Sequence, residues 1–202
     1  MFMSSRGEKQ LLGYTRTSMR VLGIDCGTEY TGYGVVDLVH DGLCTGHARG
    51  ENRDQRLVCI TCGAIRVSPR EPMPVRLSQI SRALEELIAA HHPDCVAIED
   101  VFYAVNVKSA LKLGHVRGVA MLAAASARLE VSEYAPLAIK SAVVGYGRAE
   151  KHQVQQMVAR LLRLETIPEP EDAADALAIA ICHLHTQATL ERQRRTERAT
   201  AR

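Results

Sequence analysis

The chain has 202 residues, of which 47% are hydrophobic and 24% are charged, and its formal net charge is +2. This length supports one compact domain with a substantial core. The nearly balanced charge excludes a protein that holds a polyanion by bulk charge alone, so such a partner would need local clusters, tails or metal ions. No run reaches the roughly 18 consecutive apolar residues of a membrane span, and the polar N-terminus carries no signal-peptide pattern. We therefore expect a cytoplasmic protein with no membrane partner.

The two ends of the chain differ from the middle. Residues 1–18 are polar, and we expect a disordered extension, with Met19 as a candidate start of the physiological protein. From residue 190 onward arginines dominate, and we expect residues 190–202 to form a basic disordered tail containing Arg192, Arg194, Arg195, Arg198 and Arg202. Residues 19–189 are then the one folded domain.

Three strand-like segments come first in chain order. Residues 20–25 form an apolar run that ends in an acid, and a Gly/Thr turn joins them to a second strand over residues 32–39. A glycine-rich, charged loop follows, and residues 57–67 form the third strand. Short or looped connections between neighbouring strands predict an antiparallel meander.

The hydrophobic period then changes from that of strands to that of helices. Helix patterns over 75–92 and 108–129 alternate with short strands over 94–100 and 131–136. Three helices complete the chain, over 137–147, 149–164 and 168–187. The order βββαβαβααα predicts an α/β fold with one mixed sheet covered by helices.

Six cysteines are present, and in a cytoplasmic protein we expect them to be reduced. Cys59 and Cys62, in "CITC", have the spacing of a metal-ligand pair. No second pair follows, and residues i and i+3 of a regular strand face opposite sides. A zinc site is therefore disfavoured.

Four carboxylates adjoin apolar runs, where burying an unpaired charge is costly. Asp25 ends the first strand, Glu99 ends the fourth, and Asp172 and Asp175 share one face at the start of the last helix, separated by small alanines. Four acids drawn together repel one another unless cations lie between them. The pattern therefore favours an oxygen-only site for Mg²⁺ or Mn²⁺, with two ions able to bind a scissile phosphate.

Each acid also has an ordinary interpretation. Asp172 and Asp175 could simply complement a helix N-terminus, and Glu99 could lie at a solvated sheet edge. Spacing alone does not exclude four other nearby acids, Asp37, Asp100, Glu169 and Glu171.

The motifs "LGID-x-G-x-x-x-TGYGVV", "AIE-x-VF", "SALKLG-x-x-RGVA", "VVG-x-G-x-AEK-x-QVQ-x-MV" and "DAADALAIAI-x-H" occur in order over most of the chain. Together they resemble the RuvC family of Holliday-junction resolvases, within the ribonuclease H-like nuclease superfamily. The resemblance implies a five-stranded mixed sheet, with three antiparallel strands followed by parallel ones. It also implies a catalytic, metal-binding tetrad of Asp25, Glu99, Asp172 and Asp175.

The family further implies a homodimer that cuts two strands of a four-way DNA junction with Mg²⁺, leaving 5′-phosphate and 3′-hydroxyl ends. The RuvA–RuvB branch-migration complex is then an expected partner. The N-terminal extension, the longer stretch between Asp37 and Arg56, and Tyr103 depart from the family pattern. None of these departures affects the tetrad.

Candidate DNA-binding residues lie near these motifs. Lys140 and Lys151 match lysines that the family places near DNA, although a solvated helix face would explain them equally. Lys108, Lys112 and His115 share one face of the long helix. Phe102 follows the strand of Glu99; the family favours a DNA-facing ring there, able to stack on a base, while the alternative is a core position. His183, near the end of the last helix, is assigned no ligand role.

Small residues recur every four positions in the helix over 108–129, at Ala110, Gly114 and Gly118. Glycine within a helix costs up to about 1 kcal/mol relative to alanine, and close approach of another backbone would offset that cost. We expect this helix to form the dimer interface; the alternative is packing on its own sheet.

Parts of the sequence are also compatible with two other function classes. The loop "GIDCGT" also resembles the phosphate loop of actin-like and sugar-kinase ATP-binding proteins, but those folds need two such lobes, and no second signal occurs here. A nucleic-acid-binding scaffold without catalysis is the third interpretation, and the presence of all four acids disfavours it.

Overall fold

The computed structural model describes residues 19–40, 55–100 and 107–200, and its core is one five-stranded sheet. The expected order of elements is confirmed. The sheet has the order β3-β2-β1-β4-β5, in which β3, β2 and β1 are antiparallel neighbours and β1, β4 and β5 run parallel. The strands are β1 (Met19–Asp25), β2 (Tyr30–His40), β3 (Gln55–Arg66), β4 (Cys95–Glu99) and β5 (Glu130–Tyr134).

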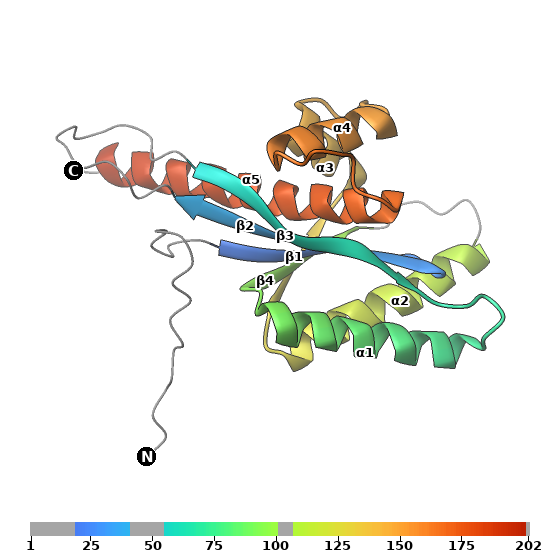
Figure 1. The fold of residues 1–202 in the computed structure, drawn as a ribbon. Helices are drawn as coiled ribbons and strands as arrows, with labels where there is room; N and C mark the ends of the chain where they lie inside the picture. The colour runs from blue at the N-terminus through green and yellow to red at the C-terminus, as the bar shows by residue number, and fades with distance from the viewer. Residues whose placement is uncertain (1–18, 41–54, 101–106, 201–202) are drawn as a thin grey trace, which may run out of the picture.

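Helices cover both faces of the sheet, as Figure 1 shows. The helices α1 (Met73–His91) and α2 (Val107–Ser126) lie on one face, and α3 (Pro136–Val144), α4 (Lys151–Leu161) and α5 (Glu171–Thr200) lie on the other. Each face has its own apolar core: Ile80 and Leu84 of α1 contribute to one, and Leu177 and Ile181 of α5 to the other. This is the mixed sheet flanked by helices that the sequence predicts.

Local sequence explains where several helices end. Pro74 lies in the first turn of α1, where its missing N–H costs no helical hydrogen bond. Gly145 ends α3 with φ of 94°, a left-handed conformation that glycine adopts without strain. The Glu150 side chain and the Gln153 side chain cap the start of α4 reciprocally. The helices therefore begin and end close to the predicted positions, except at the end of α5.

The first turns of α5 lie against the sheet because β1 and β2 present glycines beneath them. A Cβ atom built on Gly32 would lie 2.0 Å from the carbonyl oxygen of Asp172, and one on Gly23 would lie 2.1 Å from that of Ala176. Any larger residue at either position would push the helix away. The sheet glycines, together with the alanines of α5, thus fix the height at which the acids of α5 lie above the strands.

The expected disordered tail is replaced by helix in the structure, where α5 continues to Thr200. Its last turns are exposed, so hydrophobic packing does not hold them. The stretch "ATLERQRRTERAT" consists largely of residues with good helix propensity, which allows the buried part of α5 to continue outward. The tail prediction failed because the apolar pattern ends before the helix does.

A β-bulge in β3 overturns the expectation that Cys59 and Cys62 face opposite sides. Cys59 pairs with Val36 and Cys62 with Gly34, and the register shifts by one residue between them. Both cysteines therefore pack on the face covered by α5. Strand alternation failed as a guide because the inserted residue reverses the phase.

Some predictions concern residues that the structure does not describe. Phe102, Tyr103, the extension over residues 1–18 and most of the glycine-rich stretch lie outside the described residues. None of the helices in the described ranges has the length and apolar character needed to cross a bilayer.

Candidate active site

Two of the predicted acids are neighbours at the carboxyl ends of parallel strands. The register of β1 and β4 pairs Ile24 with Ile98. Asp25 and Glu99 are the next residues on each strand, so their side chains lie side by side at the edge of the sheet. The apolar residues preceding each acid are buried in the sheet, which leaves each carboxylate at the point where the core ends.

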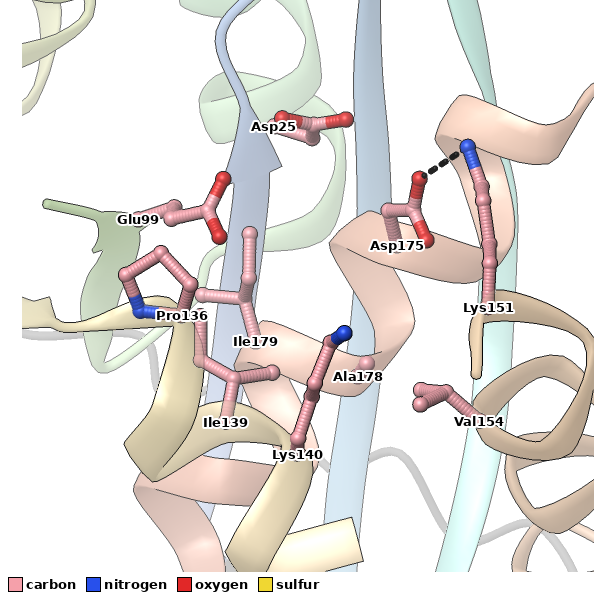
Figure 2. Close-up of a pocket in the computed structure, with 10 residues that line it drawn as sticks. All are labelled: Asp25, Glu99, Pro136, Ile139, Lys140, Lys151, Val154, Asp175, Ala178 and Ile179. Carbon is pink, nitrogen blue, oxygen red and sulfur yellow. Dashed lines mark ion pairs between the residues drawn. The ribbon is translucent and has the colours of Figure 1, made fainter. Parts of the chain in front are cut away.

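The start of α5 brings a third acid to the same place. Asp25, Glu99 and Asp175 line one cavity of about 210 Å³, and Figure 2 shows their carboxylates around it. Apolar side chains form its floor and walls: Pro136, Ile139, Val154, Ala178 and Ile179. Asp172 is one turn earlier on α5 and is not among the lining residues, but its charge acts on Asp25. The structure thus brings together three of the four predicted acids.

Burial and mutual repulsion raise the pKa values of these acids. Burial, then the charges of Asp175, Glu99 and Asp172, raise the pKa of Asp25 to about 7. Burial and the charge of Asp175 also raise the pKa of Glu99, and burial raises that of Asp175. The site therefore holds more negative charge than its surroundings stabilise.

Two lysines line the same cavity. The Nζ of Lys151 lies 3.0 Å from a carboxylate oxygen of Asp175 and 3.0 Å from one of Glu171. Burial alone would lower the pKa of Lys151, but its hydrogen bonds to these two acids outweigh burial and raise it. The Nζ of Lys140 donates to the carbonyl oxygen of Ala149 at 2.9 Å. Both lysine side chains thus line the same cavity as the acids.

The carboxylates share a cavity but do not converge on one point. Within the ranges that the structure describes, no three His, Cys, Asp or Glu side chains are arranged to hold one ion as they stand. Asp175 is turned toward Lys151, as the dashed line in Figure 2 shows. A rotation of Asp175 toward Asp25 and Glu99 would complete an all-oxygen set, which is the donor chemistry of Mg²⁺ and Mn²⁺. The residues present therefore fit a hard divalent cation.

Comparison with known proteins identifies the family that carries this arrangement. A family model described as "Crossover junction endodeoxyribonuclease RuvC" matches residues 21–183. The relative of that name from Koribacter versatilis is 62% identical over 175 residues, covering 86% of this chain and 97% of the relative. The chain belongs to the RuvC family.

Two solved structures of a RuvC from Thermus thermophilus are similar to this one. The first has a TM-score of 0.72 and 32% identity, and the second, a complex with Holliday junction substrate, has a TM-score of 0.72 and 29% identity. Each match covers 85% of this chain and 96% of the other. The RuvC fold therefore covers most of the chain.

Arg117, which the sequence analysis did not single out, supports the site of this RuvC-family chain. Arg117 of α2 donates from Nη1 to the carbonyl oxygen of Glu99 at 2.9 Å and to Asp100 at 3.1 Å, and its Nη2 pairs with Glu133 of β5. It thus ties the ends of β4 and β5 together next to Glu99, one of the acids that line the cavity. Only the three-dimensional alignment of β4, β5 and α2 shows this role.

His183 lies in the core of the RuvC domain, away from the cavity lining. Its exposed fraction is 2%, and it contacts the Tyr134 hydroxyl at 2.9 Å and the Cys95 sulfur at 3.3 Å. Burial lowers its pKa. These contacts join α5 to β4 and β5, which gives His183 a packing role.

Two further predicted DNA-binding residues, Lys108 and Lys112, lie outside the cavity. Lys108 and Lys112 are exposed on α2, on the opposite face of the sheet from α5, and do not line the cavity. Val107, Leu111 and Leu122 of the same helix have exposed fractions of 73%, 61% and 63%.

Proposed function

We propose that this chain is a metal-dependent endonuclease that resolves Holliday junctions during DNA recombination and repair. The observation that carries the proposal is the shared cavity of Asp25, Glu99 and Asp175 at the sheet edge of a RuvC-family fold. One of the two similar solved structures is the Thermus thermophilus RuvC in complex with Holliday junction substrate. This similarity supports the same substrate here. A cytoplasmic location would suit this activity.

Asp25, Glu99 and Asp175 would hold the metal. Asp172, at the start of α5, would complete the set by a rotation of its side chain. Enzymes of the RuvC family depend on metal ions, and we propose two Mg²⁺ ions, with Mn²⁺ able to substitute. Such ions supply Lewis-acid stabilisation of the phosphate charge and an activated water. The protein's own contribution is to position four carboxylates on three elements and to keep apolar walls on one side of the cavity.

Lys151 has a defined task in this proposal. Its ammonium group now neutralises Asp175 and Glu171. Once Asp175 turns toward the other acids, Lys151 is released to bind a phosphate oxygen of the substrate, with Glu171 keeping it near the site. Lys140 would hold a neighbouring phosphate from the other wall of the cavity.

DNA outside the cavity would be bound by Phe102, Lys108 and Lys112. The two lysines lie on an exposed helix face and would contact phosphates of a duplex arm. Phe102 comes three residues after Glu99 in sequence, which would bring an aromatic ring near an unpaired base at the junction centre.

We propose that one face of α2 packs against a second copy of the chain and forms the dimer interface. Val107, Leu111, Gly114, Gly118 and Leu122 recur at helical spacing, and we call them the α2 stripe. Its large side chains are exposed, and a Cβ on either glycine would meet nothing within 4 Å in the chain itself. Packing of these glycines on their own sheet is therefore not observed, which supports the dimer. Two copies would present two active sites to the symmetric strands of a junction. The RuvA–RuvB complex stays a predicted partner.

The ATP-binding alternative is not supported by the comparisons, which place the chain in a nuclease family. The experiment that tests the proposal incubates the protein with a labelled four-way junction and Mg²⁺. Controls are a chelator, a linear duplex of the same sequence and an ATP-hydrolysis assay. Paired nicks in the junction alone support the proposal, and ATP hydrolysis without nicking would contradict it.

A further inference from the structure

The bulge in β3 brings two thiols to one face of the sheet. Cys59 lies opposite Val36 and Cys62 opposite Gly34, so the three-residue step along β3 spans only two residues of β2. Two residues of strand correspond to about 6.7 Å. That separation lies at the upper end of the Cα distances, roughly 4.4–6.8 Å, that a disulfide can join. A regular strand would hold the same cysteines too far apart and on opposite faces.

The two thiols interact with each other, and the interaction separates their pKa values. It lowers the pKa of Cys62 to about 7 and raises the pKa of Cys59. Both residues are partly exposed. Burial instead raises the pKa values of the remaining described thiols, to about 12 for Cys26 and Cys95 and about 11 for Cys182.

We propose that Cys59 and Cys62 form a reversible disulfide within β3 when the protein meets a hydroperoxide. The Cys62 thiolate attacks the peroxide oxygen; the O–O bond breaks, and the leaving oxygen takes a proton to give water or an alcohol. Cys62 is then a sulfenic acid. The Cys59 sulfur attacks the sulfur of Cys62, forming the S–S bond and releasing hydroxide, which takes the Cys59 proton to become water. The protein loses two hydrogens, and one peroxide is reduced.

The arrangement favours this reaction over metal binding by the same cysteines. Within the described part of the chain no third His, Cys, Asp or Glu joins the pair as a metal ligand. An accessible thiol with a pKa near neutrality and a resolving thiol in contact are the two requirements for peroxide-driven disulfide formation. Because both cysteines are partly exposed, we expect a mild dithiol to open the bond again.

The test treats the full-length protein with hydrogen peroxide, unfolds it in denaturant, blocks the remaining thiols with an alkylating reagent, and digests it with trypsin. Cleavage after Arg56 and Arg66 releases residues 57–66, which contain both cysteines. We expect this peptide to lose two hydrogens and to escape alkylation, with full reversal by dithiothreitol. Peptides containing Cys95 or Cys182 should stay alkylated and act as internal controls.

Two variants test the order of events. In Cys59→Ser the sulfenic acid on Cys62 should accumulate and be captured by dimedone, whereas Cys62→Ser should react roughly tenfold more slowly and yield no disulfide. A 57–66 peptide that remains fully alkylated at peroxide levels that oxidise free glutathione would overturn the proposal. Equal dimedone capture in both variants would overturn the assignment of Cys62 as the attacking thiol.

Discussion

Asp25 is the residue whose protonation responds most strongly to burial and to the other carboxylates of the site. Its pKa is raised from an ordinary value of 3.8 to about 7, so the folded protein retains a proton that the unfolded chain releases between these two pH values. The contribution of Asp25 to the free energy of unfolding is complete below pH 4. It is lost as the pH rises toward 7, and the loss is at most about 4 kcal/mol.

Replacing Asp25 with Asn should remove this dependence in metal-free buffer. We expect the variant to unfold at higher urea than the wild type at pH 8, to match it at pH 4, and to bind junctions without cutting them. Urea midpoints in a chelator at both pH values provide the measurement, with exposed Glu86→Gln as the control. If the urea midpoint of the variant changes between pH 4 and 8 as much as that of the wild type, the Asp25 carboxylate does not destabilise the folded protein.

Lys151 should contribute to phosphate binding as well as to the ion pairs seen in the structure. Lys151→Met keeps the aliphatic stem but removes the charge, so we expect slower cleavage and a salt dependence of junction binding reduced by about one phosphate contact. Binding isotherms at several salt concentrations measure this slope. Arg160→Met, at the other end of α4 and exposed, should keep the wild-type slope. Unchanged slopes in both variants would exclude a phosphate contact by Lys151.

At the scale of secondary-structure elements, the position of α5 over the sheet determines the position of its acids. Gly32→Ala would place a Cβ 2.0 Å from the Asp172 carbonyl oxygen, so the start of α5 must move. We expect a loss of about 1–3 kcal/mol in unfolding free energy and a larger loss of cleavage than of junction binding.

The matched control is Gly63→Ala in the same sheet, where the nearest atom is the flexible hydroxyl end of Tyr33 at 2.7 Å. That side chain can move, so cleavage should stay near the wild-type rate. If the two variants lose cleavage equally, the height of α5 is not what positions the acids.

Much of the fold follows from the sequence because strong periodic patterns mark its elements. Apolar runs that end in Asp25 and Glu99 placed both acids correctly at strand ends, and the spacing of Asp172 and Asp175 placed them at the start of α5. The bulge at Cys59 could not be predicted because one inserted residue leaves no trace in the composition of the strand. The contacts of Arg117 could not be predicted because they join α2 to two strands that are distant in sequence.

At the scale of the whole molecule, the α2 stripe should join two copies. Gly114→Leu places a large side chain where the chain itself offers only open space, so the monomer should fold normally while the dimer dissociates. Sedimentation measures the change, and Leu137→Glu, which alters a leucine with an exposed fraction of 65% on α3, is the control that should remain dimeric. A fully dimeric Gly114→Leu protein would refute the interface.

The most direct test is the anomalous scattering of manganese in crystals of this protein soaked in Mn²⁺. We expect strong manganese peaks within the cavity, at ligand distance from oxygens of Asp25, Glu99 and Asp175, with Asp175 released from Lys151. Saturated crystals in which Asp175 remains paired with Lys151 and manganese is absent from the cavity would contradict it.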